Sequence, residues 1–182
     1  MIRFSFAVEM EFPRSQSEVF SFLEDPRSLV ESGVAVRVTG SGGRRGTGEL
    51  VCVGDTGREE FARFRVRRYR APRRTVIEQE SPPQDRAHFP GATMKSREES
   101  RYVTTEAGCR VIRTVDYTLL NVQALRDDAA NLLSQVFKES TKHDLDRLRE
   151  ALLRRDDGLR RPKATEDQRD GGLPGRDPYL NG

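Results

Sequence analysis

The sequence contains no tryptophan, and only two cysteines and two histidines among its 182 residues. Cys52 and Cys109 lie far apart, with no CxxC motif and no neighbouring histidine. Neither a zinc site nor a disulfide framework is therefore indicated. His88 and His143 also lack metal-ligating neighbours in the sequence. We expect reduced cysteines, no metal site and no cofactor.

Long apolar runs are also missing. The first twelve residues alternate apolar and polar side chains, unlike a signal peptide, and no later segment approaches the roughly 20 apolar residues that span a membrane. The 32 basic and 29 acidic residues nearly balance at a net charge of +3, so the sequence indicates no strong positive field for nucleic acid. We expect a soluble, cytoplasmic, single-domain protein that is not integral to a membrane.

The order of the remaining elements predicts a sheet that grips a helix. Alternation from Ile2 to Phe12 predicts a half-buried strand with its even residues inward. Ser15 and Glu18 form a capping box at the start of a short helix. Pro26 ends that helix and starts a second one, Arg27 to Ser32.

Several antiparallel strands and one long helix are predicted to follow. The expected strands cover residues 34–38, 49–53, 61–70 and 75–80 and a long hairpin over 93–120. Apolar residues at steps of three and four predict a helix from Val122 to Arg154. Residues 155–182 are charged and rich in Gly and Pro, so we predict a disordered tail after a domain of residues 1–154.

Two basic segments have alternative interpretations. The arginines of strand 61–70 could attract nucleic acid or an anionic membrane. A four-residue turn at 71–74 would instead set Arg67 against Glu78 and Arg65 against Glu80, which favours a solvated, charge-paired outer face. The glycine-rich stretch 40–48 could cradle an anion, but its spacing is not that of a P-loop, and a flexible hairpin is favoured.

The sequence resembles the START-like, or SRPBCC, superfamily, nearest to its polyketide cyclase/dehydrase and lipid-transport branch. The resemblance lies in SEVFSFLEDPRSLVESG, RVRRYRAPRR, EAGCRVIRTVDYTL and the closing helix, and it covers residues 2–153. It implies an α+β helix-grip fold, in which an antiparallel sheet of six to seven strands wraps around a long C-terminal helix. Two short helices follow the first strand, and an apolar cavity lies between sheet and helix. It implies no single activity, because this fold serves lipid carriers, hormone receptors and aromatase/cyclases.

The last hairpin contains the most informative side chains. Arg113 falls on its apolar, inward face, where an arginine needs a partner. A turn near Gly108 places Ser100 opposite Arg113, with Glu98 and Tyr102 diagonal to it, which predicts a Glu98–Arg113 ion pair inside the cavity. Arg113, Glu98 and Tyr102 are candidate catalytic residues that would orient a ligand carbonyl or phenol. The alternative is a purely structural ion pair.

We therefore expect a small hydrophobic or amphipathic ligand, of polyketide, lipid or isoprenoid type. The predicted ligand-binding residues are Phe64, Val66, Met94, Ser100, Val115, Tyr117, Leu132, Val136 and Ser140. Two other functions stay open: an aromatase/cyclase in which Arg113 holds an enolate oxygen while Tyr102 or Glu98 moves protons, and a protein-interaction module whose interior is filled by its own side chains. A homodimer is also left open.

Overall fold

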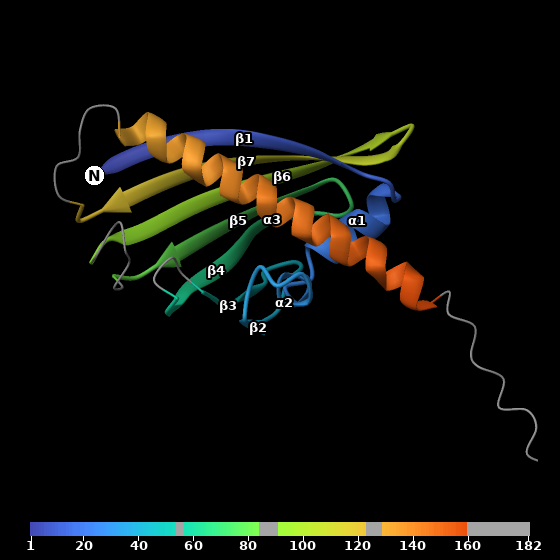
Figure 1. Cartoon of the computed structure of the whole chain (residues 1–182), viewed down its shortest axis with the longest axis horizontal. Coiled ribbons are helices and arrows are strands. Elements are labelled where there is room, and N and C mark those ends of the chain that lie inside the picture. Colours follow the sequence, from blue (N-terminus) through green and yellow to red (C-terminus); the bar gives the residue numbers. More distant parts are fainter. Residues whose placement is uncertain (54–56, 84–90, 123–128, 160–182) are drawn as a thin grey trace, which may run out of the picture.

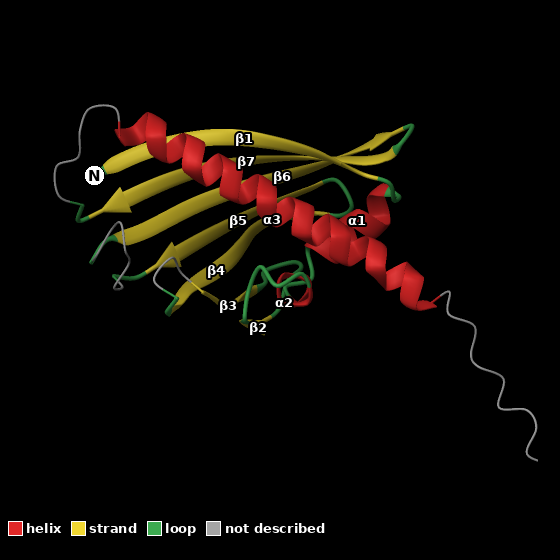
Figure 2. Cartoon of the chain, viewed as in Figure 1, coloured by secondary structure: helices red, strands yellow, loops and turns green. Residues whose placement is uncertain are grey.

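A computed structural model describes residues 1–53, 57–83, 91–122 and 129–159. One antiparallel sheet has the strand order β1-β7-β6-β5-β4-β3-β2, and α3 lies across one of its faces (Figures 1 and 2). The strands are β1 (Ile2–Phe12), β2 (Arg37–Gly40), β3 (Thr47–Val53), β4 (Glu59–Arg70), β5 (Arg74–Ser81), β6 (Thr93–Thr105) and β7 (Gly108–Leu120). The helices are α1 (Gln16–Leu23), α2 (Arg27–Glu31) and α3 (Ala129–Leu159). The predicted α+β helix-grip fold is confirmed.

The N-terminal third follows the sequence pattern. The even residues of β1 are buried against α3, because a strand directs alternate side chains to one face. The capping box is present: Ser15 Oγ accepts from Glu18 N at 3.3 Å, and Glu18 Oε2 accepts from Ser15 N at 3.0 Å. Glu24 is the C-cap residue of α1 and Pro26 is the N-cap residue of α2, so the Glu24 carboxylate lies at the junction of the two helices.

The register of the β6–β7 hairpin agrees with the sequence prediction, whereas that of the β4–β5 hairpin differs from it. In the β6–β7 hairpin Ser100 pairs with Arg113, as predicted. The predicted four-residue turn between β4 and β5 is wrong, because only residues 71–73 join the strands and the register shifts around Arg67. Arg65 therefore pairs with Glu78 instead of Glu80, although Arg67 Nε still contacts Glu78 Oε2 at 2.5 Å.

α3 crosses the sheet over β1, and its far half contacts α2. The side chain of Arg147 donates to the carbonyl of Gly33 at the end of α2, and Arg155 forms an ion pair with Glu31. The helix continues to Leu159, past the predicted domain boundary at 154. The predicted start at 122 and most of the predicted tail lie outside the described residues. No helix among the described residues is long and apolar enough to cross a membrane.

The buried stripe of α3 is narrower than predicted. Leu145, Leu148, Ala151 and Leu152 belong to the core, and Leu133 and Phe137 pack against it. Leu132 and Val136 are 62% and 56% exposed, and Ser140 is exposed as well. Each helical residue is rotated by about 100° from the one before it, so seating Leu133 and Phe137 on β1 turns Leu132 and Val136 off the contact. The prediction that these three residues share the buried face is wrong.

Candidate functional site

The inner face of the sheet carries a polar cluster around Arg113. Its Nε lies 3.0 Å from Glu98 Oε1 and donates to Ser100 Oγ at 3.2 Å. The side chains of Arg113 and Glu98 are only 12% and 16% exposed. The ion pair predicted from the hairpin register is therefore confirmed, and it lies in the interior of the grip.

Glu24 brings a second carboxylate to this cluster from the end of α1. Its Oε1 accepts hydrogen bonds from Tyr102 OH at 2.5 Å and from Thr75 Oγ1 at 2.6 Å, and the residue is 9% exposed. Burial raises the pKa of Glu24, and the two hydrogen bonds and the charge of Arg113 oppose that rise. Glu24 and Thr75 were not predicted as site residues, because a charged residue at a helix end is usually solvated.

A third carboxylate, that of Asp144 on α3, lies close enough to Arg113 and Glu98 to be affected by their charges. Burial raises its pKa, and the charges of Arg113 and Arg147 oppose that rise. Asp144 makes no ion pair or hydrogen bond with the described residues. It was not predicted either, because it shares the sequence pattern of the solvated acids along the same helix. No group of three or more potential metal ligands occurs in the described part of the chain.

Several polar atoms of the cluster have no partner. The two Nη atoms of Arg113 and Oε2 of Glu24 make no hydrogen bond with the described residues. Among those residues, the only completely buried side-chain nitrogen or oxygen atoms without a hydrogen bond are Ser28 Oγ and Arg74 Nε. The free atoms of Arg113 and Glu24 are therefore not completely enclosed by the described part of the protein, and a water-sized molecule can contact them.

Apolar side chains surround these polar atoms. Phe64, Val66 and Val115 are buried on the same face of the sheet, and Met94 and Tyr117 are partly buried against the core. Ser100 and Tyr102 are almost completely buried. Tyr117 also packs against the ring of Phe137 on α3, with ring centroids 4.8 Å apart. The predicted site residues of the strands thus lie together, whereas Leu132, Val136 and Ser140 of α3 are exposed.

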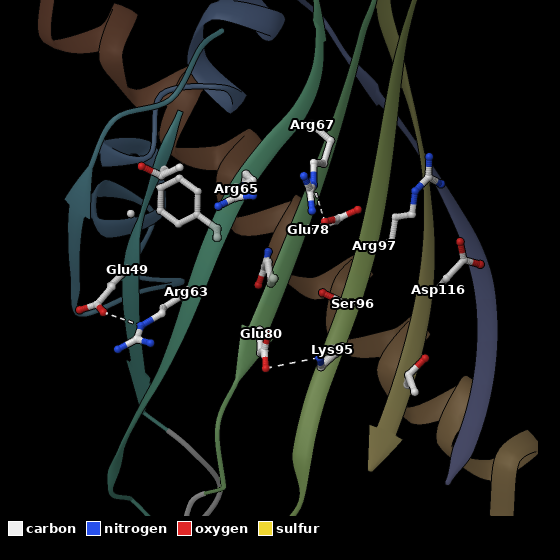
Figure 3. Close-up of a pocket in the computed structure, with 15 residues that line it drawn as sticks. Glu49, Arg63, Arg65, Arg67, Glu78, Glu80, Lys95, Ser96, Arg97 and Asp116 are labelled. Atoms are coloured by element: carbon white, nitrogen blue, oxygen red, sulfur yellow. Dashed lines mark hydrogen bonds and ion pairs between the residues drawn. The ribbon is translucent and has the colours of Figure 1, made fainter. Parts of the chain in front are cut away.

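The opposite face of the sheet carries a groove of about 880 Å³ (Figure 3). Its charged lining consists of Glu49, Arg63, Arg65, Arg67, Glu78, Glu80, Lys95, Arg97 and Asp116. Ion pairs join Arg63 Nε to Glu49 Oε1 at 3.0 Å and Lys95 Nζ to Glu80 Oε1 at 3.5 Å, as the dashed lines in Figure 3 show. Basic and acidic residues therefore compensate each other across neighbouring strands. This is the charge-paired outer face that the sequence favoured, and it is separate from the Arg113 cluster.

The glycine-rich loop between β2 and β3 holds the Glu24 junction in place. A Cβ atom on Gly42 would lie 2.1 Å from the backbone oxygen of Glu24 and 2.9 Å from Pro26 Cδ. Only glycine permits such a close approach of two backbones. The loop thus has a packing role at the base of the site, beyond that of a flexible hairpin.

Comparisons with known proteins identify the fold. No family model and no curated protein matches the sequence. A putative uncharacterised protein from Rhizobium leguminosarum has a TM-score of 0.64 at 14% identity, over 84% of this chain and 95% of that one. Ara h 8.0201 has a TM-score of 0.62 at 12% identity, over 84% and 99% of the two chains.

A third structure is the di-domain ARO/CYC StfQ from the steffimycin biosynthetic pathway. Its TM-score is 0.64 at 12% identity, over 86% of this chain and 53% of that longer one. At such identities the likeness concerns the path of the backbone, which agrees with the seven-stranded antiparallel sheet and the long C-terminal helix described above. The comparisons show that this chain has the helix-grip fold, which is the fold that its sequence resemblance to the START-like, or SRPBCC, superfamily implied.

Proposed function

We propose that the protein binds a small hydrophobic or amphipathic molecule, of polyketide, lipid or isoprenoid type, between the inner face of the sheet and α3. The observation that carries the proposal is the set of free, reachable polar atoms on Arg113 and Glu24 within apolar surroundings. Reachable donors and acceptors of this kind can bind the polar group of a ligand in place of water. The apolar side chains around them can contact the rest of the ligand.

The arrangement suggests how such a ligand would lie. The two Nη atoms of Arg113 would donate to a carbonyl or phenol oxygen, and Nε stays with Glu98 and Ser100. The apolar body of the ligand would contact Phe64 and Val66, with Met94, Val115 and Tyr117 nearby on the same face. A few fixed polar groups within an apolar lining are typical of small-molecule sites.

A neutral fluorescent probe, N-phenyl-1-naphthylamine, tests this proposal. Ile77 is partly buried, pairs with Glu98 and lies on the inner face beside Val66. Ile77→Trp should fill the interior and weaken probe binding about tenfold or more, which corresponds to 1.4 kcal/mol. Thr114→Trp, exposed on the outer face, is the matched control and should leave affinity unchanged. Equal affinity for both variants would contradict an interior site, and no binding by the unmodified protein would favour the interaction module.

The hydrogen bond between Tyr102 and Glu24 favours a second candidate, an aromatase/cyclase. In this case Arg113 stabilises an enolate oxygen of a poly-β-keto chain, while Tyr102 or Glu98 transfers protons during loss of water. One solved structure with this fold, StfQ, is named an ARO/CYC, which supports this candidate without assigning the reaction here. Formation of an aromatic product by the purified protein separates catalysis from binding.

A further inference from the structure

We infer that the interior of the grip selects amphiphiles with a basic amine and disfavours those with a carboxylate. This inference rests on the proposed binding function and specifies the chemistry of its ligand. It follows from the charges of the inner cluster, in which Arg113 pairs with Glu98 at 3.0 Å while Glu24 and Asp144 lie close enough to Arg113 to be affected by its charge.

The positive charge of Arg113 is already matched. Its ion pair with Glu98 brings together one cation and one anion at 3.0 Å. Glu24 receives only the neutral hydroxyl groups of Tyr102 and Thr75, and both hydrogen bonds end on Oε1. Oε2 of Glu24, a residue that is only 9% exposed, is an acceptor without a donor among the described residues.

Asp144 lacks a dedicated counter-ion as well. The basic groups close enough to affect it are Arg113, Arg147 and His143. Arg147 donates to the backbone oxygen of Gly33, and His143 is exposed. The nearby acids and neutral groups, Glu98, Tyr117 and Cys52, supply no positive charge. The cluster therefore holds more carboxylates than cations. Burial raises the pKa of both Glu24 and Asp144, and the charge of Glu98 adds to that rise.

The excess of carboxylates over cations in the cluster favours one kind of ligand head group over another. An ammonium group offers several N–H donors and a positive charge, so it can bind Glu24 Oε2 and compensate the unmatched carboxylates. A carboxylate head group could reach the Nη atoms of Arg113, but it would bring a fourth anion into a poorly solvated interior. Its attraction to Arg113 would then be offset by repulsion from the three acids.

Three ligands with the same chain test the inference: dodecylamine, dodecanol and dodecanoate, titrated calorimetrically into the full chain at pH 7.5, below their micelle concentrations. We expect dodecylamine to bind at least about tenfold more tightly than dodecanoate, a difference of 1.4 kcal/mol, with dodecanol between them. Glu24→Gln and Asp144→Asn should each reduce the difference in affinity between dodecylamine and dodecanoate. Glu150→Gln, which removes the same charge from an exposed position of α3, is the control and should leave this difference in affinity unchanged.

The outcomes separate this inference from the proposed function. If dodecanoate binds as tightly as dodecylamine, or more tightly, the head-group inference is overturned and the binding function stands. The head-group inference is also overturned if dodecylamine binds more tightly but neither Glu24→Gln nor Asp144→Asn reduces the difference in affinity. Cooperative melting of both variants shows that they are folded in this comparison. If none of the three ligands binds, the proposed function itself fails.

Discussion

Replacing Arg113 with leucine should lower the free energy of unfolding by about 3 to 5 kcal/mol, because the change leaves a buried carboxylate without its counter-ion. The ion pair with Glu98 is mostly buried, and the pairing of Ser100 with Arg113 across β6 and β7 sets the position of the guanidinium beside Glu98. Glu98→Gln should also destabilise the protein, since Arg113 would then keep a charge without its nearest partner. Urea unfolding followed by circular dichroism measures both effects.

The double variant Arg113→Leu/Glu98→Leu should recover much of this loss, because removing both charges removes the penalty for burying either one. Arg110 and Glu11 provide the control, as an exposed ion pair from β7 and β1 with Nε and Oε1 2.6 Å apart. Arg110→Leu should destabilise the protein far less than Arg113→Leu does, because solvent screens both partners of the exposed pair. Equal effects of Arg110→Leu and Arg113→Leu would show that the interior pair is as well solvated as the surface pair.

Leu145→Ala should cost about 2 to 5 kcal/mol, because the side chain is completely buried where α3 meets the sheet and its loss leaves a cavity. The same helix supplies the control. Leu132→Ala removes the same atoms from an exposed position and should change the stability by no more than about 0.5 kcal/mol. Urea unfolding of the two variants side by side tests the position of the helix on the sheet. A larger loss for Leu132→Ala would mean that α3 is rotated relative to the face described above.

Local patterns predicted much of this fold. The alternation from Ile2 to Phe12 and the capping box at Ser15 depend only on neighbouring residues, and both are found in the structure. The hairpin register that joins Ser100 to Arg113 follows from the turn between Thr105 and Gly108 and from the period of the strand. The Arg113–Glu98 pair could therefore be inferred from the sequence.

The remaining errors come from contacts between distant parts of the chain. Glu24 is buried by Thr75 and Tyr102, which lie 51 and 78 residues further along the sequence. The register shift near Arg67 lies within a strand, and no turn-forming residue marks its position in the sequence. Leu132 and Leu133 are equally apolar neighbours, and only the placement of α3 over β1 decides which of them is covered.

The uncovered face of the sheet has a consequence for the behaviour of the protein at high concentration. In Figure 3, β4 and β6 present basic side chains and β5 presents acidic ones, so charges of opposite sign alternate from strand to strand. Stacking two such faces to exclude water would strip solvent from many ionised groups at once, and most relative positions would oppose like charges. A bare sheet of this size is otherwise prone to aggregation. We therefore expect the alternation of charge to disfavour self-association through this face.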